Sequence, residues 1–244
     1  MLDHSRNFQQ KKDEALAEGY LTKELASFYE ELFACQEKNL LSGETYDFSS
    51  FTDSSELPAL KPEALSFVGD LGEASKGVLL EHDVESLAEA AASMKTGLDE
   101  YIFILVNWLK PVLASIWPSA MKDVETEEWL APVCPFCGYL ADMSKIVESK
   151  DNLRLLHCGL CEHEWKFPRV TCAICENTDK ETLGFLNTSD ESPYRVDYCD
   201  TCKGYIKTVR IPKLQEESRF DLTVENVVTT WLDASAMDMG YNRP

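Results

Sequence analysis

Eight of the nine cysteines in this sequence form four Cys-x-x-Cys pairs within residues 134–202. Two residues between two cysteines allow a tight turn that directs both sulfur atoms at one ion, and two such turns complete a tetrahedron of thiolates. The pattern therefore predicts two metal sites with four thiolate ligands each. The eight predicted ligands, separated between pairs by 20, 10 and 23 residues, are Cys134, Cys137, Cys158, Cys161, Cys172, Cys175, Cys199 and Cys202.

The four pairs can be combined in two ways. Neighbouring pairs give one site from the first two pairs and a second site from the last two, which is the simpler arrangement. An interleaved arrangement, first with third and second with fourth, satisfies the same spacing. A redox dithiol of the thioredoxin type needs one pair at the start of a helix after a strand, so four pairs in series favour metal binding.

The metal itself is zinc or a single iron ion, because four thiolates suit both. Cys137 is followed by Gly138 and Tyr139, and a glycine and an aromatic residue also follow the cysteine turns of rubredoxin. In those turns backbone N–H groups point at the sulfur atoms, and such hydrogen bonds stabilise either zinc or iron. A closed four-thiolate site offers no position for substrate. No phosphate-binding loop or nucleophile motif is present either, so the sequence predicts no enzyme. His157 and His163 flank the second pair and are interpreted as packing or supporting residues.

Charge and hydropathy exclude other classes of protein. The net charge of −20 argues against non-specific binding of nucleic acid, which needs a basic face. The most apolar stretch, residues 101–109, is too short to cross a bilayer, and no targeting segment is visible at the N-terminus. The sequence thus predicts a cytoplasmic protein without membrane insertion, in a compartment where thiols stay reduced.

Apolar periodicity predicts helices in the first half of the chain and again at its end. One helix is expected over 13–41, a second from Pro62, a third from Asp83 or Ser86, and a buried one over 99–117. A last helix carries Val224, Val228 and Trp231 on one face and is expected to pack back on the fold. Six short β-prone runs lie between, at 144–147, 153–157, 163–170, 183–187, 194–199 and 205–210.

These elements predict an α+β fold with four parts. An all-helical domain occupies residues 1–120, and two small β modules of the rubredoxin or zinc-ribbon type follow at 131–170 and 171–212. A C-terminal helix at 220–240 completes the fold. Small β modules of roughly 30 residues bury too little surface to fold alone, so metal binding is expected to contribute directly to their folding.

A more specific pattern runs through residues 154–175. Cys158-Gly-Leu-Cys161 is followed by Glu164-Trp165, Arg169 and the third cysteine pair. Two further motifs accompany this pattern: the Cys-Pro-x-Cys-Gly opening at 134–138, and the last cysteine pair followed by Tyr205. Together these motifs resemble those of formate dehydrogenase accessory proteins of the FdhE type. The resemblance extends over 132–210 and to the closing helix. The chain departs from that family at 139–142 and in its shorter helical half.

This resemblance implies a cytoplasmic accessory role in the production of active formate dehydrogenase. It implies that the chain acts as a maturation factor or chaperone that binds that enzyme's catalytic subunit. It also implies that the eight cysteines hold iron, and it predicts nothing about oligomeric state. Three alternatives remain open. They are a rubredoxin-like electron carrier, a generic zinc-stabilised interaction module, and a nucleic-acid-binding zinc ribbon suggested by Lys203, Lys207 and Arg210.

Overall fold

The computed structural model describes residues 3–41, 125–187, 192–212 and 214–243, with residue 189 and parts of 107–122. The chain forms two compact units: residues 1–21 with 114–244, and residues 22–113. The predicted helices from Pro62 and from 83 or 86 lie outside the described residues, as does most of the helix predicted over 99–117. In the parts that are described, no helix combines the length and the apolar character that a membrane span requires.

The N-terminal helical segment is interrupted at Gly19. Helix α1 spans His4–Ala17, with the Asp3 side chain accepting from the Arg6 N–H at 2.9 Å, and α2 spans Lys23–Leu41. The single helix predicted over 13–41 is therefore wrong. Gly19 adopts a φ of 72°, and the N–H of Tyr20 reaches back to the Ala15 carbonyl at 2.8 Å, which ends α1 in a left-handed cap.

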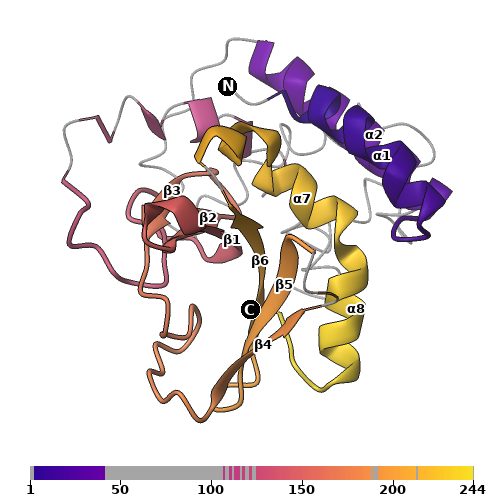
Figure 1. The fold of residues 1–244 in the computed structure, drawn as a ribbon. Coiled ribbons are helices and arrows are strands. Elements are labelled where there is room, and N and C mark those ends of the chain that lie inside the picture. The colour runs from indigo at the N-terminus through magenta and orange to yellow at the C-terminus, as the bar shows by residue number, and fades with distance from the viewer. Residues whose placement is uncertain are drawn as a thin grey trace, which may run out of the picture. The chain divides into compact units, whose positions relative to one another are not determined.

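All six strands belong to one sheet in the order β3-β2-β1-β6-β5-β4 (Figure 1). Its first half contains β1 (Ala141–Val147), β2 (Leu153–Cys158) and β3 (Glu164–Lys166), paired antiparallel. Its second half contains β4 (Leu183–Asn187), β5 (Tyr194–Cys199) and β6 (Tyr205–Ile211), also antiparallel. A short 3-10 turn, η3 (Glu148–Lys150), connects β1 to β2, and another, η4 (Leu214–Arg219), follows β6.

The two halves of the sheet are joined by parallel pairing of β1 with β6. The register runs from Met143 opposite Lys207 to Val147 opposite Ile211. The Ser144 and Thr208 hydroxyls lie 2.6 Å apart across this junction, and both residues are buried. The predicted α+β class is confirmed, and the two β modules share one continuous sheet.

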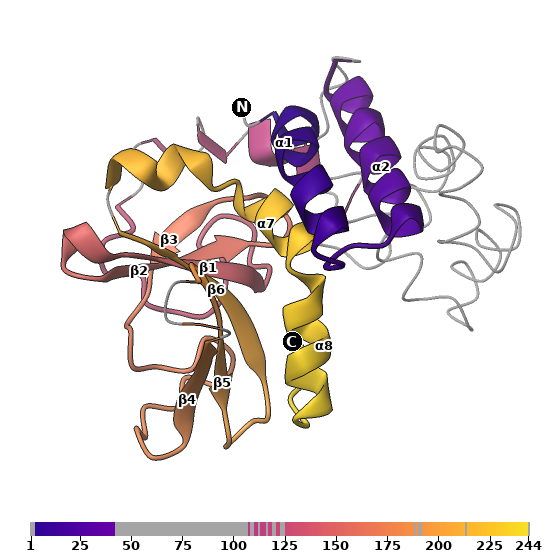
Figure 2. The same ribbon diagram turned by 45° about the vertical axis from the view of Figure 1, so that its right-hand side comes forward.

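Two C-terminal helices, α7 (Leu222–Val228) and α8 (Thr230–Asp238), pack against this sheet (Figure 2). Leu232 and Ala236 of α8 form one core cluster with Val196 of β5 and Tyr205 of β6. Leu222 of α7 joins a second cluster with Met143, Val209 and Ile211. Burial of these apolar side chains against the sheet is the main force that holds the helices in place.

A buried ion pair lies beneath α8. Lys207 of β6 is 1% exposed, and its Nζ donates to Asp233 at 2.6 Å and to the Asn226 carbonyl at 2.7 Å. The Tyr205 hydroxyl donates to the second oxygen of Asp233 at 2.8 Å. Burial lowers the pKa of Lys207 to about 8, although Asp233 acts in the opposite direction. The ammonium group is therefore kept charged near neutral pH by its hydrogen bonds.

Helix α1 is attached to the same unit by His4. Its Nδ1 lies 2.7 Å from Asp221, the N-cap of α7, and its Nε2 lies 2.8 Å from Glu162. Burial lowers the pKa of His4, but the hydrogen bonds to Asp221 and Glu162 outweigh it and raise the pKa to about 10. The imidazolium form thus connects α1 to α7 and to the turn after Cys161.

This contact predicts a specific dependence of stability on pH. Because the folded pKa is raised above the unfolded value of about 6.5, the contribution of His4 is fully present below pH 6.5 and is lost as pH rises toward 10. Urea unfolding of the wild type and of His4→Gln at pH 6, 8 and 10 measures it. The difference in unfolding free energy should shrink steadily over that range, and a constant difference would contradict the assignment.

Candidate metal centres

The first cysteine cluster lies where β1 and β2 end in turns. Cys134 and Cys137 occupy the turn before β1, Cys158 is the last residue of β2, and Cys161 lies in the turn before β3. The Sγ atoms of Cys134 and Cys161 are 3.5 Å apart, and that of Cys137 is 3.4 Å from Cys158 and 3.5 Å from Cys161. Cys137 is half-buried and the other three are buried.

The second cluster repeats this arrangement in the other half of the sheet. Cys172 and Cys175 occupy the turn before β4, Cys199 ends β5, and Cys202 lies in the turn before β6. The Sγ atoms of Cys172 and Cys202 are 3.7 Å apart, and those of Cys175 and Cys199 are 3.9 Å apart. Cys175 is exposed and Cys202 is half-buried, so this cluster is more open to solvent than the first.

The structure brings neighbouring pairs together and not interleaved ones. Within each cluster the four sulfur atoms all lie within 4.8 Å of one another. The described part of the chain holds no third group of this kind. Nothing is described of the side chain of Cys35, the ninth cysteine.

Each Cys-x-x-Cys turn has the same backbone geometry. The residue directly after the second cysteine has a positive φ in all four turns: Gly138 (73°), Glu162 (61°), Glu176 (59°) and Lys203 (57°). The N–H of each first cysteine donates to the carbonyl five residues later, at 2.8–3.0 Å, in the pairs Cys134–Tyr139, Cys158–His163, Cys172–Asn177 and Cys199–Gly204. The turns are therefore formed by backbone hydrogen bonds, and only the first uses glycine at its left-handed position.

The donor geometry fits a tetrahedral ion. Four sulfur atoms about 2.3 Å from one ion lie about 3.8 Å from one another. The separations of 3.4–3.5 Å in the first cluster and 3.7–3.9 Å in the second come close to this value. Backbone N–H groups also point at sulfur, from Phe136 to Cys134 and from Ile174 to Cys172, both at 3.4 Å. These N–H groups would stabilise thiolate ligands of zinc or of iron.

The thiol of Cys199, in the second cluster, has a lowered pKa. Burial raises the pKa of Cys199, but the N–H groups of Cys202 and Thr201 and the Asn177 amide outweigh it and lower the pKa to about 6. In contrast, burial raises the pKa of Cys172 to about 12. A metal ion displaces the remaining protons when it binds, because thiolates are its ligands.

Both histidines beside the second turn support the site without joining it, as the sequence predicts. His157 Nδ1 lies 2.7 Å from Asp142, and although burial lowers its pKa, Asp142 raises it overall. The His163 ring packs edge-on against Trp117 with ring centres 4.5 Å apart. Burial lowers the pKa of His163, so its ring is neutral at pH 7.

The left-handed residues give a direct stability prediction. Glu176 has a φ of 59° and is exposed, so Glu176→Gly should relieve backbone strain without removing packing. The expected gain in unfolding free energy is about 0.5–1 kcal/mol. Glu181→Gly is the matched control, because Glu181 is also exposed and lacks a positive φ. Chemical unfolding of the metal-loaded proteins should show a gain for Glu176→Gly and a loss for Glu181→Gly.

Comparisons with known proteins agree with this geometry. Residues 133–169 match the family model described as FdhE, central domain. The matched segment contains all four cysteines of the first cluster. This segment of the chain is therefore similar to the central domain of FdhE.

Curated relatives match this chain over longer stretches. An FdhE homolog of Shewanella oneidensis is 29% identical over 171 residues, covering 67% of this chain and 55% of the relative. FdhE of Escherichia coli is 28% identical over 190 residues, covering 75% and 59%. An FdhE homolog of Aquifex aeolicus is 25% identical over 161 residues, covering 64% and 55%. The matched regions thus span less than two thirds of each relative's length.

The fold of this chain also matches a solved structure. The crystal structure of the FdhE protein from Pseudomonas aeruginosa aligns with a TM-score of 0.66 at 20% identity. The alignment covers 99% of this chain and 92% of that one. At this identity the match establishes the fold alone.

Proposed function

We propose that this chain is an accessory factor for formate dehydrogenase that binds the enzyme's catalytic subunit in the cytoplasm and assists its assembly or activation. The observation that carries the proposal is the pair of complete four-cysteine clusters in an FdhE-like chain. The partner is the one that the family resemblance implies. No catalytic role is proposed, since each cluster supplies four thiolates and leaves no position for substrate.

In this proposal the eight clustered cysteines are the ligands of two metal ions, one per cluster. The ions are zinc or iron, and both match the sulfur separations. Their role is structural, because each ion joins the turn before a β-hairpin to the turn after it, at the end where Ala141 lies opposite Cys158 and Leu183 lies opposite Cys199. These roles are proposed for four parts of the chain. They are the helical domain at 1–120, the modules at 131–170 and 171–212, and the helix at 220–240.

Affinity purification under anaerobic conditions tests the proposal. The tagged, metal-loaded chain is expressed in its native host grown on formate, and co-purifying proteins are identified by mass spectrometry. The proposal expects the catalytic subunit of a molybdenum- or tungsten-type formate dehydrogenase. Its absence, under conditions where that enzyme is abundant, would reject the role.

A rubredoxin-like electron carrier is the second candidate. The exposed Cys175 and the N–H groups directed at Cys172 favour it, because solvent access and N–H···S bonds tune the potential of an iron site. This candidate requires a visible spectrum that bleaches reversibly on reduction. A colourless protein that contains only zinc would reject the electron-carrier role.

A further inference from the structure

A basic cavity of about 300 Å³ lies beside the second cysteine cluster, on the second half of the sheet. It is formed by β4, β5 and the segment that leads into the third cysteine pair, with one side chain from β2. The size is at the lower end for pockets that bind small molecules. The charged side chains that line it are Arg154, Arg169, Lys180, Arg195 and Asp197.

Arg154 is buried at this cavity although it carries a full charge. It is 4% exposed, and its Nη1 donates to the Thr171 carbonyl at 3.0 Å and to the Pro168 carbonyl at 3.4 Å. Its Nε has no hydrogen-bond partner among the described residues. The nearest carboxylate is Asp197, 3.6 Å from Nη2. A guanidinium group so placed is held rigidly and is only partly neutralised.

Asp197 is shared and does not balance the other cations. It also accepts from the Thr208 hydroxyl at 2.7 Å and lies 2.8 Å from the Arg195 Nε. Arg169 and Lys180 are exposed and form no ion pair within the described residues. Four cations and one carboxylate leave an excess of three positive charges at this cavity, in a chain with a net charge of −20.

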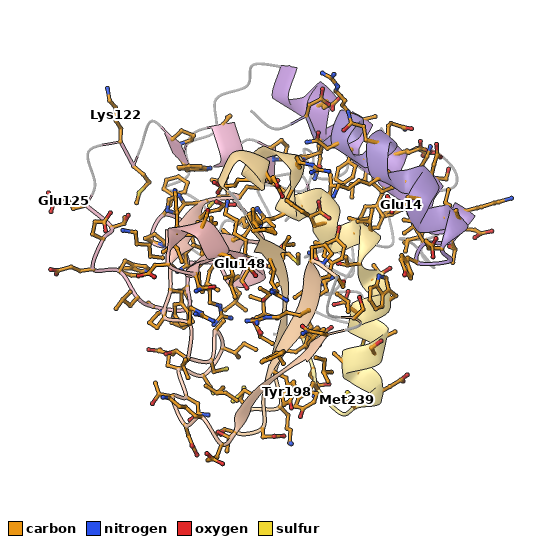
Figure 3. All side chains as sticks on the ribbon, in the orientation of Figure 1. Glu14, Lys122, Glu125, Glu148, Tyr198 and Met239 are labelled. Carbon is orange, nitrogen blue, oxygen red and sulfur yellow. The ribbon has the colours of Figure 1, made fainter. Side chains whose placement is uncertain are left out.

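The cations could serve only to offset the thiolates of Cys172 and Cys199, which also line the cavity. That explanation leaves the apolar part of the wall unaccounted for. Phe185 is 56% exposed and Val170 is 47% exposed, and Arg195 lies over the Phe185 ring at 4.9 Å. Tyr198, labelled in Figure 3 on β5, closes the wall so tightly against Gly184 that an added Cβ would lie 2.3 Å from its ring. Positively charged and apolar side chains therefore line the same cavity.

We propose that this cavity binds a carboxylate carried on an aromatic or apolar body. Guanidinium groups match the planar fork of a carboxylate, and Arg169 and Lys180 at the rim add attraction. The aromatic or apolar body would lie against Phe185 and Val170, which are otherwise exposed to water. The proposal stands independently of the formate dehydrogenase partner.

Calorimetry with three small probes tests the chemistry of the cavity, using the full metal-loaded chain in low-salt buffer. N-acetylphenylalanine carries both features, its amide lacks the charge, and inorganic phosphate lacks the apolar body. The proposal expects the first probe to bind at least tenfold more tightly than the other two. Equal binding of the amide, stronger binding of phosphate, or no binding of any probe would overturn it.

Paired charge variants then locate the binding. Arg169→Gln with Lys180→Gln should weaken the affinity for N-acetylphenylalanine at least tenfold. Lys122→Gln with Lys150→Gln removes the same charge from exposed positions outside the cavity, and Lys122 points away from the sheet in Figure 3. This control should change affinity less than twofold. Equal effects of the two pairs would show general charge attraction and reject the site.

Discussion

Replacing Cys137 or Cys175 by alanine should remove about one metal ion per chain and loosen the half of the sheet that contains it. Three thiolates bind zinc or iron far more weakly than four, and the free energy of binding is also free energy of folding. Metal analysis of the purified variants gives the stoichiometry, and amide hydrogen exchange shows which strands lose protection. Cys137→Ala should affect β1, β2 and β3 first, and Cys175→Ala should affect β4 and β5.

Cys35→Ala is the control for this experiment, because Cys35 is the cysteine that lies outside the four Cys-x-x-Cys pairs of the sequence. It should retain both ions. Retention of two ions in Cys137→Ala or Cys175→Ala would reject those residues as ligands. Loss of both ions in either variant would mean that the two halves of the sheet depend on each other for folding.

Asp233→Ala should lower the unfolding free energy by about 3–5 kcal/mol, the usual cost of leaving a buried charge without its partner. Lys207 is 1% exposed, and only the carbonyls of Asn226 and Thr229 would remain for its Nζ. The pKa of Lys207 is already lowered to about 8 by burial. Because the unfolded lysine binds its proton more tightly, the deficit should shrink as pH rises from 7 to 9.

Two control variants separate charge from packing in this prediction. Asp238 is exposed on the same helix, so Asp238→Ala should change the unfolding free energy by less than about 0.5 kcal/mol. Combining Asp233→Leu with Lys207→Met removes both charges and should recover most of the loss. Urea unfolding at pH 7 and pH 9 gives all three values. A double variant as unstable as Asp233→Ala would show that packing, and not the unpaired charge, is responsible.

Alternation and turn residues predicted the positions of the six described strands, although β1 begins at Ala141, three residues before the predicted run at 144–147. The runs at 183–187 and 194–199 match β4 and β5 at both ends, and those at 153–157 and 205–210 differ from β2 and β6 by one residue. The run at 163–170 is longer than β3, which spans Glu164–Lys166: the Phe167 N–H still donates to the Arg154 carbonyl of β2 at 3.1 Å, and the pairing stops before Pro168. Proline has no N–H to donate to a neighbouring strand.

The cysteine spacing predicted two four-cysteine sites but allowed two ways of combining the pairs, and the simpler one is observed. It did not reveal the left-handed residues after the second cysteine in three of the four turns. Glu162, Glu176 and Lys203 carry no sequence signal for a positive φ. Their conformation is imposed by the hydrogen bonds of the turn, and only Gly138 could be read from the sequence.

Features made by distant segments were beyond sequence reasoning. The pairing of β1 with β6 joins residues about 60 positions apart, and no local pattern distinguishes it from two separate sheets. The basic cavity likewise combines Arg154 with Arg195, which are far apart in the chain. Gly19 does carry a local signal, because a glycine after a helical run favours a left-handed cap.

The junction of β1 with β6 would link the two proposed metal centres thermodynamically. If each ion stabilises its own half, and the halves share hydrogen bonds from Met143–Val147 to Lys207–Ile211, binding at one centre raises the affinity of the other. By reciprocity the gain must be equal in both directions. Loading with metal would then be cooperative, with fewer chains carrying a single ion than two independent centres would give.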